Sequence, residues 1–561
     1  MNAKQEKLKP KLFSVMKDYS LSQFAKDLVS GIIVAIIALP LSIALALASG
    51  VGPEQGIYTA IVAGFLISFF GGSRVQIAGP TAAFATIVAG IVATDGMDGL
   101  VVATIIAGVL LILMGLFRVG SLIKFIPYTI TTGFTAGIAV TILVGQIKDF
   151  LGLTYPKGTV TIETTEKLVA IAKNITTINI QAVIVGVVCL AILIVWPLIS
   201  KRIPGSLIAV IVGILMVKFL GLKVNTIGDL YTISNALPSF HMPAFSLLTI
   251  RKELSNGFTI AILAAIESLL SAVVADSMIN SKHRSNMELV AQGIGNIGSA
   301  LFGGIPATGA IARTAANIKN GGRTPIAGMV HAIILVFVLV LLMPYAALIP
   351  MPTIAAILFT VAYNMCGWRN FKRLCQKAPK SDIIVLVLTF VLTVVFDLVV
   401  AIAVGMVAAA VLFMKRMSEE ASIHGWTYEI DESENDPDSI DLREVPHEVR
   451  IYEITGPMFF GVADLITDIT VKDFTKVLII RMRGVPAIDA TAMQSLENLV
   501  SRCEKKGVTV VFSHVNPQPY RVMEKAGLIQ TVGADNFCKH IDDALSRAEL
   551  LSQSDKNPSS K

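Results

Sequence analysis

Long apolar runs separated by short polar connections occupy the chain from about residue 27 to residue 414. A helix rises about 1.5 Å per residue, so about 20 apolar residues span the ~30 Å hydrocarbon core of a bilayer. We predict fourteen apolar helical segments, at approximately 28–48, 54–70, 81–94, 99–117, 127–147, 180–199, 204–220, 257–276, 287–302, 308–318, 324–343, 346–365, 382–397 and 399–414. The chain is therefore expected to be a multi-span α-helical membrane protein over most of its length.

Two short segments in this region open with a proline among small residues. One begins with GPTAAF at 79–84, and the other with GGIPATG at 303–309. They occupy matching places in the two halves, since Pro80 and Pro306 lie 226 positions apart, and neither is long enough to cross a bilayer. Paired, interrupted segments of this kind mark the binding site of a transporter, and helix N-termini inside a membrane favour an anion. The pattern predicts an anion transporter.

Basic residues concentrate in alternate connections between the apolar segments. These connections hold Arg74, Arg118, Lys124, Lys201, Arg202, Lys282, Arg284, Lys319, Arg323, Arg369, Lys372, Arg373, Lys377 and Lys380. Because cytoplasmic loops are enriched in Lys and Arg, these connections are expected to face the cytoplasm. The protein is expected in the plasma (inner) membrane, and an even number of segments places both termini in the cytoplasm. Residues 1–26 are then a basic cytoplasmic tail rather than a cleaved signal. Seven segments per half orient the two halves oppositely, as an inverted repeat requires.

Beyond the transmembrane transport domain at 27–414, the composition becomes that of a soluble domain. The stretch 415–448 is rich in Asp and Glu, has no apolar period and is expected to be a linker. Strands are then predicted near 449–454, 477–480 and 508–512, and helices near 490–505, 519–525 and from 539. Strands alternating with helices indicate a small cytoplasmic α/β domain at 449–548, followed by a disordered tail at 549–561.

Composition argues against several classes of function. Of the 561 residues, 54% are hydrophobic and 15% are charged, which is not a soluble globular composition. The net charge of +6 does not indicate a nucleic-acid partner, because the basic residues lie where membrane topology places them. The five cysteines have no metal or redox spacing. No nucleophile–base pair or phosphate-binding glycine loop suggests an enzyme, so no cofactor or metal is expected.

Several motifs resemble those of the SulP (sulfate permease) family of anion transporters. They are ALPLS at 38–42, GVGPEQGIY at 50–58, GGSR at 71–74, GPTA at 79–82, VAD at 274–276, EL at 288–289, Gly293, Asn296, Gly298, FGG at 302–304, Pro306 and GGRT at 321–324. The resemblance covers nearly the whole chain in order. The C-terminal part resembles the STAS domain that is appended to members of that family.

The resemblance implies seven plus seven inverted repeats, with a core domain of segments 1–4 and 8–11 and a gate domain of segments 5–7 and 12–14. It also implies a homodimer in membrane lipid, elevator-like motion of the core domain against the gate domain, and a STAS domain open to a regulatory partner. The family's substrates include sulfate, bicarbonate, chloride and C4-dicarboxylates, and the motifs do not choose among them.

Departures from the family pattern bear on the substrate and on the coupling ion. Sulfate-carrying relatives commonly have Gln after the first-segment proline, where this chain has Leu41, which makes the segment similar to that of bacterial bicarbonate carriers. The sodium-coupled bicarbonate relatives have Asp and Thr where this chain has Glu267 and Ser271. The resemblance therefore leaves the coupling ion open between H⁺ and Na⁺.

The openings of the two short segments form the candidate site for a small inorganic or carboxylate anion. The residues are Thr81, Ala82, Ala83, Phe84, Thr308, Gly309 and Ala310. Small side chains let an oxyanion approach backbone N–H groups, and threonine hydroxyls add donors; the alternative is ordinary proline-initiated helix packing. Arg313 lies in the second short segment, where a charge must find a partner or face water. It either gives the anion positive potential or forms a structural ion pair with Glu267.

Glu267 and Ser271 lie four residues apart on one helix face and are the candidates for binding the coupling ion. Desolvation favours the protonated form of a buried carboxylate, whereas a nearby arginine favours the charged form. Protonation would remove the repulsion between Glu267 and an incoming anion, which favours H⁺ coupling. The rival is Na⁺ held by both side chains and backbone carbonyls. An uncoupled exchanger or channel and a membrane-tethered sensor are the alternative functions.

Four other polar residues are interpreted without a direct role at the anion site. We interpret His331 as a packed helix-end residue, Asp397 as part of a polar turn and Asp276 as a structural hydrogen-bond partner. In the soluble domain, Thr491 of the sequence IDAT lies where regulatory STAS domains have a phosphorylatable serine. The alternative is a capping box, formed by Thr491 and Gln494, that opens a helix.

Overall fold

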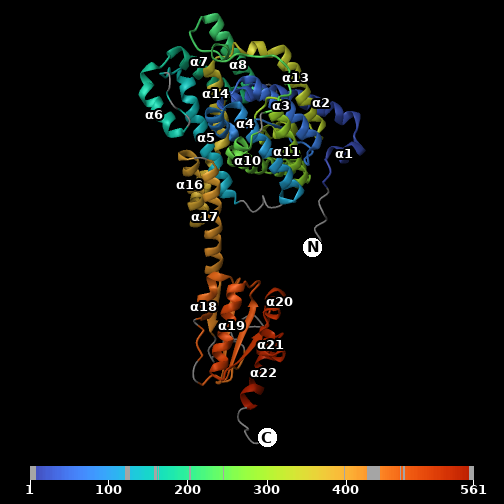
Figure 1. The fold of residues 1–561 in the computed structure, drawn as a ribbon, viewed down its shortest axis with the longest axis vertical. Helices are drawn as coiled ribbons and strands as arrows, with labels where there is room; N and C mark the ends of the chain where they lie inside the picture. Colours follow the sequence, from blue (N-terminus) through green and yellow to red (C-terminus); the bar gives the residue numbers. More distant parts are fainter. Residues whose placement is uncertain are drawn as a thin grey trace. The chain divides into compact units, whose positions relative to one another are not determined.

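The chain divides into two compact units, Met1–Met406 and Val407–Lys561. The computed structural model describes residues 8–120, 127–156, 159, 161, 163–200, 204–243, 246–396, 398–425, 443–467, 469–471 and 474–554. Figure 1 shows that the first unit is built of helices, whereas the second contains a sheet flanked by helices. Asp397, which we expected in a turn, lies outside the described residues.

Most of the first unit is helical, and α17 continues from it into the second unit. The helices that overlap the predicted apolar segments are α2 (Leu21–Ala48), α3 (Pro53–Phe70), α4 (Ala85–Leu116), α5 (Tyr128–Leu151), α7 (Ile180–Ile199), α8 (Gly205–Leu220), α10 (Leu247–Ile279), α11 (Ser285–Leu301), α12 (Ile311–Lys319), α13 (Ile326–Ala346), α14 (Met351–Cys366), α16 (Lys380–Val395) and α17 (Leu398–Glu419). Further helices are α1 (Leu12–Val15), α6 (Thr164–Asn174), α9 (Ile227–Leu230) and α15 (Trp368–Lys377), with 3₁₀ turns at Met16–Asp18, Ala82–Phe84 and Ile175–Thr177.

All fourteen predicted segments overlap these helices. Helix α4 overlaps two predicted segments, 81–94 and 99–117. The backbone of Gly96, with φ of 68°, is not helical and divides α4 between them. By length and composition, eight of the described helices could cross a membrane unaided. Together with the sequence of the connections, this arrangement is a multi-span helical membrane fold.

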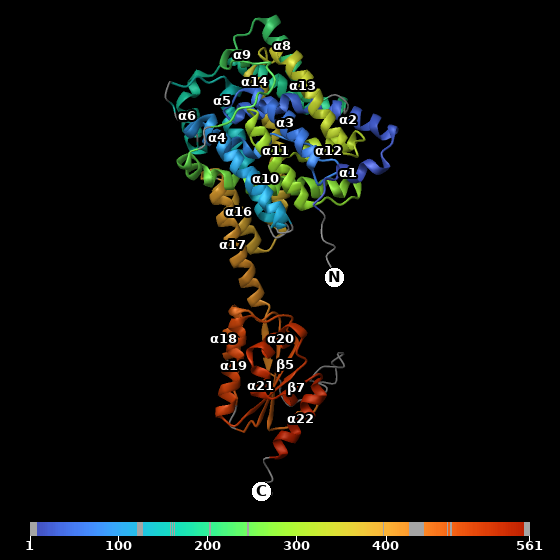
Figure 2. The same cartoon turned by 45° about the vertical axis from the view of Figure 1, so that its right-hand side comes forward.

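The two halves of the membrane region interleave. Helices α10 and α11 pack against α4, and α11 and α13 pack against α3, although these partners are far apart in the sequence. Figure 2 shows the green and yellow helices of the second half lying among the blue helices of the first. Helices α14 and α16 pack instead against α5. The fold is thus the expected pair of inverted repeats, with a core domain and a gate domain.

Several helix starts differ from the sequence prediction, and those of α2, α10 and α12 have a clear physical reason. Helices α2 and α10 begin at Leu21 and Leu247, well before their apolar segments, and the hydroxyls of Ser20 and Ser246 accept hydrogen bonds from the N–H groups of their first turns. Charged residues separate these first turns from the long apolar runs, namely Lys26 and Asp27 in α2 and Arg251, Lys252 and Glu253 in α10, so a search for apolar runs misses the helix starts. Helix α12 begins at Ile311, later than predicted, because the chain before it is extended.

Two short strands join the repeats. Strand β1 (Ala78–Gly79) pairs antiparallel with β2 (Thr308–Gly309), so that Ala78 lies opposite Gly309. Each strand precedes one of the two short apolar segments. Non-helical backbone inside a membrane must find its hydrogen-bond partners in the protein, and this pairing supplies some of them. It also brings the openings of the two short segments side by side.

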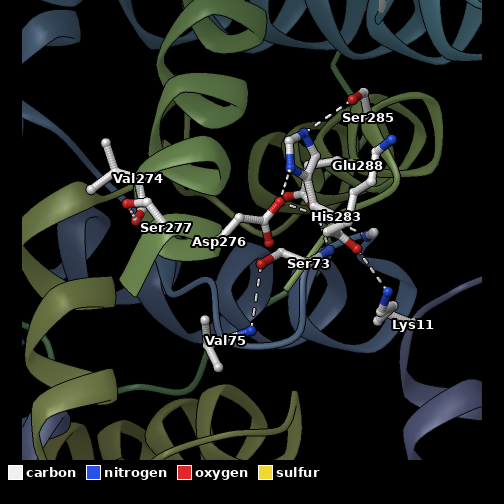
Figure 3. A network of polar contacts seen from close by, with 11 residues as sticks. Lys11, Ser73, Val75, Val274, Asp276, Ser277, His283, Ser285 and Glu288 are labelled. Atoms are coloured by element: carbon white, nitrogen blue, oxygen red, sulfur yellow. Dashed lines mark hydrogen bonds and ion pairs between the residues drawn. The ribbon is translucent and has the colours of Figure 1, made fainter. Parts of the chain in front are cut away.

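The described part of the expected N-terminal tail is packed rather than free. The Lys11 ammonium donates a 2.8 Å hydrogen bond to the carbonyl oxygen of Lys282, in the connection between α10 and α11. The Arg284 guanidinium donates to the Lys9 carbonyl oxygen at 2.7 Å and to the Ser14 hydroxyl at 2.9 Å. Figure 3 shows Lys11 at the edge of this connection. The Lys282 carbonyl oxygen thus holds Lys11, and Arg284 holds Lys9 and Ser14, so this part of the N-terminal segment packs against the connection between α10 and α11.

Asp276, near the end of α10, stabilises the same connection between α10 and α11. Its carboxylate accepts hydrogen bonds from the backbone N–H and from the ring Nδ1 of His283, both at 2.7 Å. The His283 ring in turn contacts the Ser285 hydroxyl at 3.0 Å, as Figure 3 shows. These contacts agree with the structural role that we expected for Asp276.

Glu288, on α11, is fully buried and ties α11 to the stretch that leads into β1. One carboxylate oxygen accepts the backbone N–H groups of Gly72 and Ser73, at 2.8 and 3.0 Å. The other oxygen accepts the side-chain amides of Gln76 and Gln292, at 2.9 and 3.0 Å. A buried charge is tolerated when it is hydrogen-bonded in this way.

Glu288→Gln should destabilise the first unit, because its amide NH₂ would face donors where an oxygen now accepts two hydrogen bonds. The expected cost is about 1–3 kcal/mol, measured as a lower melting temperature of the purified protein in detergent. Asp98→Asn is the matched control, since Asp98 is exposed in the same unit. Equal melting temperatures for the two variants would contradict this role.

The second unit contains a five-stranded sheet in the order β3-β4-β5-β6-β7. Strand β3 (Ser422–Gly425) is antiparallel to β4 (Val449–Thr455), whereas β5 (Val477–Gly484), β6 (Thr509–Ser513) and β7 (Phe537–Cys538) continue the sheet in parallel. Its helices are α18 (Ala463–Thr467), α19 (Ala490–Lys505), α20 (Pro517–Ala526), α21 (Leu528–Val532) and α22 (Ile541–Ser554), with 3₁₀ turns at Phe460–Val462 and Ala534–Asn536. Separate apolar clusters fill the two faces of the sheet, one of them under α22.

The limits of this unit differ from those we expected. The stretch predicted as a linker at 415–448 includes the end of α17 and the edge strand β3, while 426–442 lies outside the described residues. The tail predicted from 549 begins inside α22, which continues to Ser554. Strand β3 has only four residues, too few for an alternating pattern to be recognised in the sequence.

Candidate functional site

A cavity of about 420 Å³ lies in the first unit at the openings of the two short segments. Its walls come from α2, α10 and α12, from residues 80–83 before α4, and from α5 and α14. The first four elements belong to the core domain and the last two to the gate domain. The cavity is therefore located between the two domains.

The first short segment contributes as the sequence predicts. Thr81, Ala82 and Ala83 line the cavity, and Phe84 is buried behind them with 1% of its surface exposed. Residues Ala82–Phe84 form the 3₁₀ turn that opens α4. The first N–H groups of such a turn have no partner within the helix and are available to a ligand.

The second short segment is placed differently from the prediction. Thr308 is fully buried, and its hydroxyl lies 2.6 Å from that of Ser268. The N–H groups of Gly309 and Ala310 are already used, in bonds of 3.1 Å to the Ser268 hydroxyl and 2.9 Å to the Ile77 carbonyl oxygen. Gly309 and Ala310 still line the cavity, but their N–H groups are not free for an anion.

The free first turn of this segment is instead at 311–313. Ile311, Ala312 and Arg313 line the cavity, and α12 begins at Ile311. The first N–H groups of a helix lack intrahelical partners. The donors that α12 offers therefore lie three residues further along than the sequence suggests.

Arg313 presents an uncompensated positive charge at the cavity. Only 1% of the residue is exposed, and Nη2 donates to the Pro80 carbonyl oxygen at 3.1 Å and to the Ser42 hydroxyl at 3.3 Å. Nε and Nη1 have no hydrogen-bond partner among the residues that the structure describes. Among the described residues Arg313 forms no ion pair, so the alternative of a pair with Glu267 is not realised in this structure. Gly79 lets the guanidinium approach, since a Cβ there would lie 2.3 Å from Nη1.

Glu267 lies at the cavity wall and is connected to the first short segment. Its carboxylate accepts a 2.9 Å hydrogen bond from the Thr81 hydroxyl. Ser271, the second predicted coupling residue, does not line the cavity. It is 1% exposed, and its hydroxyl has no partner within the described ranges of the chain. His331 is fully buried in α13, in agreement with a packed residue, although it lies in the second turn of the helix rather than at its end.

Several wall residues were not predicted. Thr135 on α5 and Asn364 on α14 line the cavity from the gate domain, and Ser268 orders the stretch before α12. No local pattern singles out Thr135 or Asn364, since their position depends on how the two domains pack. Ser268 follows Glu267 directly and could have been found as a second hydroxyl on that helix. Leu41, noted as a departure from the family pattern, also lines the cavity.

In the second unit, Thr491 is exposed in the first turn of α19. The N-cap of this helix is Asp489, whose carboxylate accepts the N–H groups of Ala492 and Phe460, both at 2.9 Å. The capping box that we considered for Thr491 is therefore wrong. Phosphorylation of Thr491 stays a prediction.

Two interrupted helices that meet at a cavity, within a multi-span helical unit followed by an α/β unit, define a membrane transport protein with a STAS domain. The chain belongs to the Sulfate permease family, which matches residues 24–389, and the STAS domain matches residues 440–544. The resemblance noted in the sequence is thus confirmed.

The relatives cover nearly the whole chain. It is 40% identical over 533 residues to the putative sulfate transporter YvdB of Bacillus subtilis, covering 94% of this chain and 98% of that one. It is 32% identical over 542 residues to the bicarbonate transporter BicA of Picosynechococcus sp., covering 93% and 94%. The murine Solute Carrier 26 family member A9 anion transporter in the inward-facing state has the same fold, with a TM-score of 0.85 over 97% of this chain and 94% of that one at 19% identity.

Ala312→Phe should fill the cavity beside the first turn of α12 and lower the affinity for an anion at least tenfold, which corresponds to about 1.4 kcal/mol. Binding of labelled sulfate and bicarbonate to the purified protein measures it. Ala312→Ser is the control, because serine is nearly as small as alanine and should leave the affinity unchanged. Both variants should have the melting temperature of the parent protein. Gly309 is a poorer target, because a Cβ there would lie 2.1 Å from Gln76 Nε2 and would disturb packing. Unchanged affinity in Ala312→Phe would place the anion elsewhere.

Proposed function

We propose that this protein is a secondary active transporter of inorganic anions of the sulfate or bicarbonate class. The anion is held between the first turns of α4 and α12. One observation carries the proposal: two helix N-termini and the unpaired nitrogens of Arg313 converge on one cavity.

Electrostatics favours an anion in this cavity. Each helix N-terminus is equivalent to roughly half a positive charge, and Arg313 adds a full charge with little solvent to screen it. Glu267 is the opposing charge at the wall. An anion that enters while Glu267 is neutralised would meet only positive potential, so binding of the anion and of a cation at Glu267 would favour each other.

The size and the lining of the cavity are compatible with C4-dicarboxylates and bicarbonate as well as with sulfate. About 420 Å³ is within the range of roughly 300–1,000 Å³ for small-molecule sites, so a C4-dicarboxylate remains an alternative. Leu41 puts an apolar wall where sulfate carriers commonly have Gln, which supports bicarbonate. The relative at 40% identity is named a putative sulfate transporter, and the relative at 32% a bicarbonate transporter.

The position of the cavity between the two domains supports alternating access by an elevator-like motion. A rigid movement of the core domain along α5 and α14 would carry the anion, its helix N-termini and Arg313 together. We further propose a homodimer in the plasma (inner) membrane with both termini cytoplasmic. In that arrangement the STAS domain is available to a regulatory partner.

We propose H⁺ as the coupling ion, bound by Glu267. The hydrogen bond from Thr81 connects this carboxylate directly to the first half-helix, so protonation of Glu267 would change the electrostatic potential at the anion site. Na⁺ coupling is the second candidate, supported by the buried, unpartnered Ser271 hydroxyl one helical turn away. An uncoupled exchanger or channel is the third.

Uptake by the purified protein in liposomes tests the function. Labelled bicarbonate, sulfate, fumarate and chloride are offered under imposed pH and sodium gradients. We expect accumulation of bicarbonate or sulfate against its gradient when the outside is acidic. Flux of every anion only down its own gradient would identify an uncoupled exchanger or channel, and no flux of any anion would contradict the transport function.

Glu267→Gln should retain anion binding and exchange but lose accumulation driven by the pH gradient, because the amide mimics the protonated carboxyl group. Counterflow and net uptake in the same liposomes separate these two properties. Glu267→Asp is the matched control, since it keeps a titratable group and should keep pH-driven uptake. If Glu267→Gln still accumulates the anion on a pH gradient, Glu267 is not the proton carrier.

A further inference from the structure

Helix α15 divides its residues sharply between two faces. Its sequence is WRNFKRLCQK, at 368–377, between the membrane helices α14 and α16. At 100° per residue, the apolar residues Trp368, Phe371, Leu374 and Cys375 share one side, and the three basic residues Arg369, Lys372 and Arg373 share the other. Lys377 extends the basic side. We had expected only a basic connection here, not a helix.

The apolar side of α15 is in contact with the gate domain. Phe371 packs against Phe390 of α16 with ring centroids 5.3 Å apart, and Leu374 and Cys375 are half-buried. The side chain of Asn370 is hydrogen-bonded to the hydroxyl of Tyr128 at the start of α5. These contacts fix the orientation of the helix, so the basic side faces away from the protein.

The basic side is exposed and carries no compensating charge. Arg369, Lys372, Arg373 and Lys377 are all exposed, as is Lys380 just beyond the helix. In the described part of the chain none of these five residues forms an ion pair. The helix itself contains no acidic residue. Arg373 Nη2 donates a 2.6 Å hydrogen bond to Asn370 Oδ1, which is uncharged. Five positive charges are thus held together with no ion-pair partner among the described residues.

The place of α15 in the chain puts these charges at the level of lipid headgroups. Gly367 alone separates α15 from α14, and Ala378 and Pro379 separate it from α16. Both neighbours are membrane helices, and the distribution of Lys and Arg is expected to place this connection on the cytoplasmic side. Cytoplasmic leaflets are rich in anionic lipids.

We propose that α15 is an interfacial helix that binds the headgroups of anionic phospholipids with its basic side. Amphipathic helices with Lys and Arg on the polar side and aromatic residues on the other bind membrane surfaces in this way. Trp368, which is 44% exposed, extends the apolar side toward the acyl chains. Because α15 is attached to α5 and α16, bound lipid anchors the gate domain at this leaflet.

The test uses the full-length protein with Trp368 as its only tryptophan, obtained by Trp196→Phe and Trp426→Phe. It is reconstituted in phosphatidylcholine with a minority of phosphatidylglycerol. Two preparations of identical composition carry brominated chains either on the phosphatidylglycerol or on an equal amount of phosphatidylcholine. Since each basic residue near the surface favours an anionic leaflet by about 1 kcal/mol, we expect quenching of Trp368 by brominated phosphatidylglycerol to exceed that by brominated phosphatidylcholine by about twofold or more.

Variants in the same background assign the effect to α15. Arg369→Gln/Lys372→Gln/Arg373→Gln should abolish the preference, and Arg369→Lys/Arg373→Lys should keep it. The matched control Lys505→Gln/Lys506→Gln/Lys525→Gln removes three exposed charges from the second unit and should keep the preference. High salt should weaken the preference without any substitution, which keeps the test valid if the triple Gln variant fails to fold.

Three results would overturn the proposal. The first is equal quenching by the two brominated lipids in the parent protein. The second is loss of the preference in the Lys505/Lys506/Lys525 control. The third is displacement by soluble glycerol phosphate at low concentration, which would indicate a site for a small free anion rather than a lipid surface.

Discussion

The membrane region depends on how non-helical backbone is satisfied inside a bilayer. A broken helix exposes N–H and C=O groups that lipid cannot bond, so each break must be closed by the protein. Here the two breaks close each other. Strands β1 and β2 pair, the Ala310 N–H donates to Ile77, and the Ile77 N–H donates to the Thr314 hydroxyl at 3.0 Å. The first N–H groups of each half-helix lack intrahelical partners, and residues of both first turns line the cavity.

The same principle explains why polar residues are tolerated in the interior of the core domain. Asp27 is fully buried near the start of α2 and accepts hydrogen bonds from the backbone N–H of Arg323 at 2.9 Å and from the Thr324 hydroxyl at 2.5 Å. Glu288 ties α11 to the stretch before β1 in the same manner. These carboxylates connect elements from both halves of the chain. They join the two halves of the core domain to each other around the half-helices.

Arg313 is the charged side chain at the cavity whose buried nitrogens are only partly hydrogen-bonded. A buried guanidinium normally has its donors satisfied, yet only Nη2 of Arg313 has partners. Its nearest structural supports are a carbonyl oxygen and a hydroxyl, neither of which neutralises its charge. The positive charge is therefore left for whatever occupies the cavity. Glu267 accepts its hydrogen bond from Thr81 instead, so the charges of Glu267 and Arg313 lie at separate points of the cavity wall.

The sequence by itself determined the fourteen helical segments and the α/β domain, because the periods and lengths of apolar runs record which surfaces meet lipid or core. It also pointed to the two paired openings at which the cavity lies. It did not determine which N–H groups remain free. That depends on Ser268 and Ile77, which are distant in the chain and use the donors of Gly309 and Ala310. Tertiary packing also decided that Thr135 and Asn364 reach the cavity and that Lys9–Ser14 is held by Arg284. Each of these outcomes is a competition between hydrogen-bond partners from different segments, which no local pattern records.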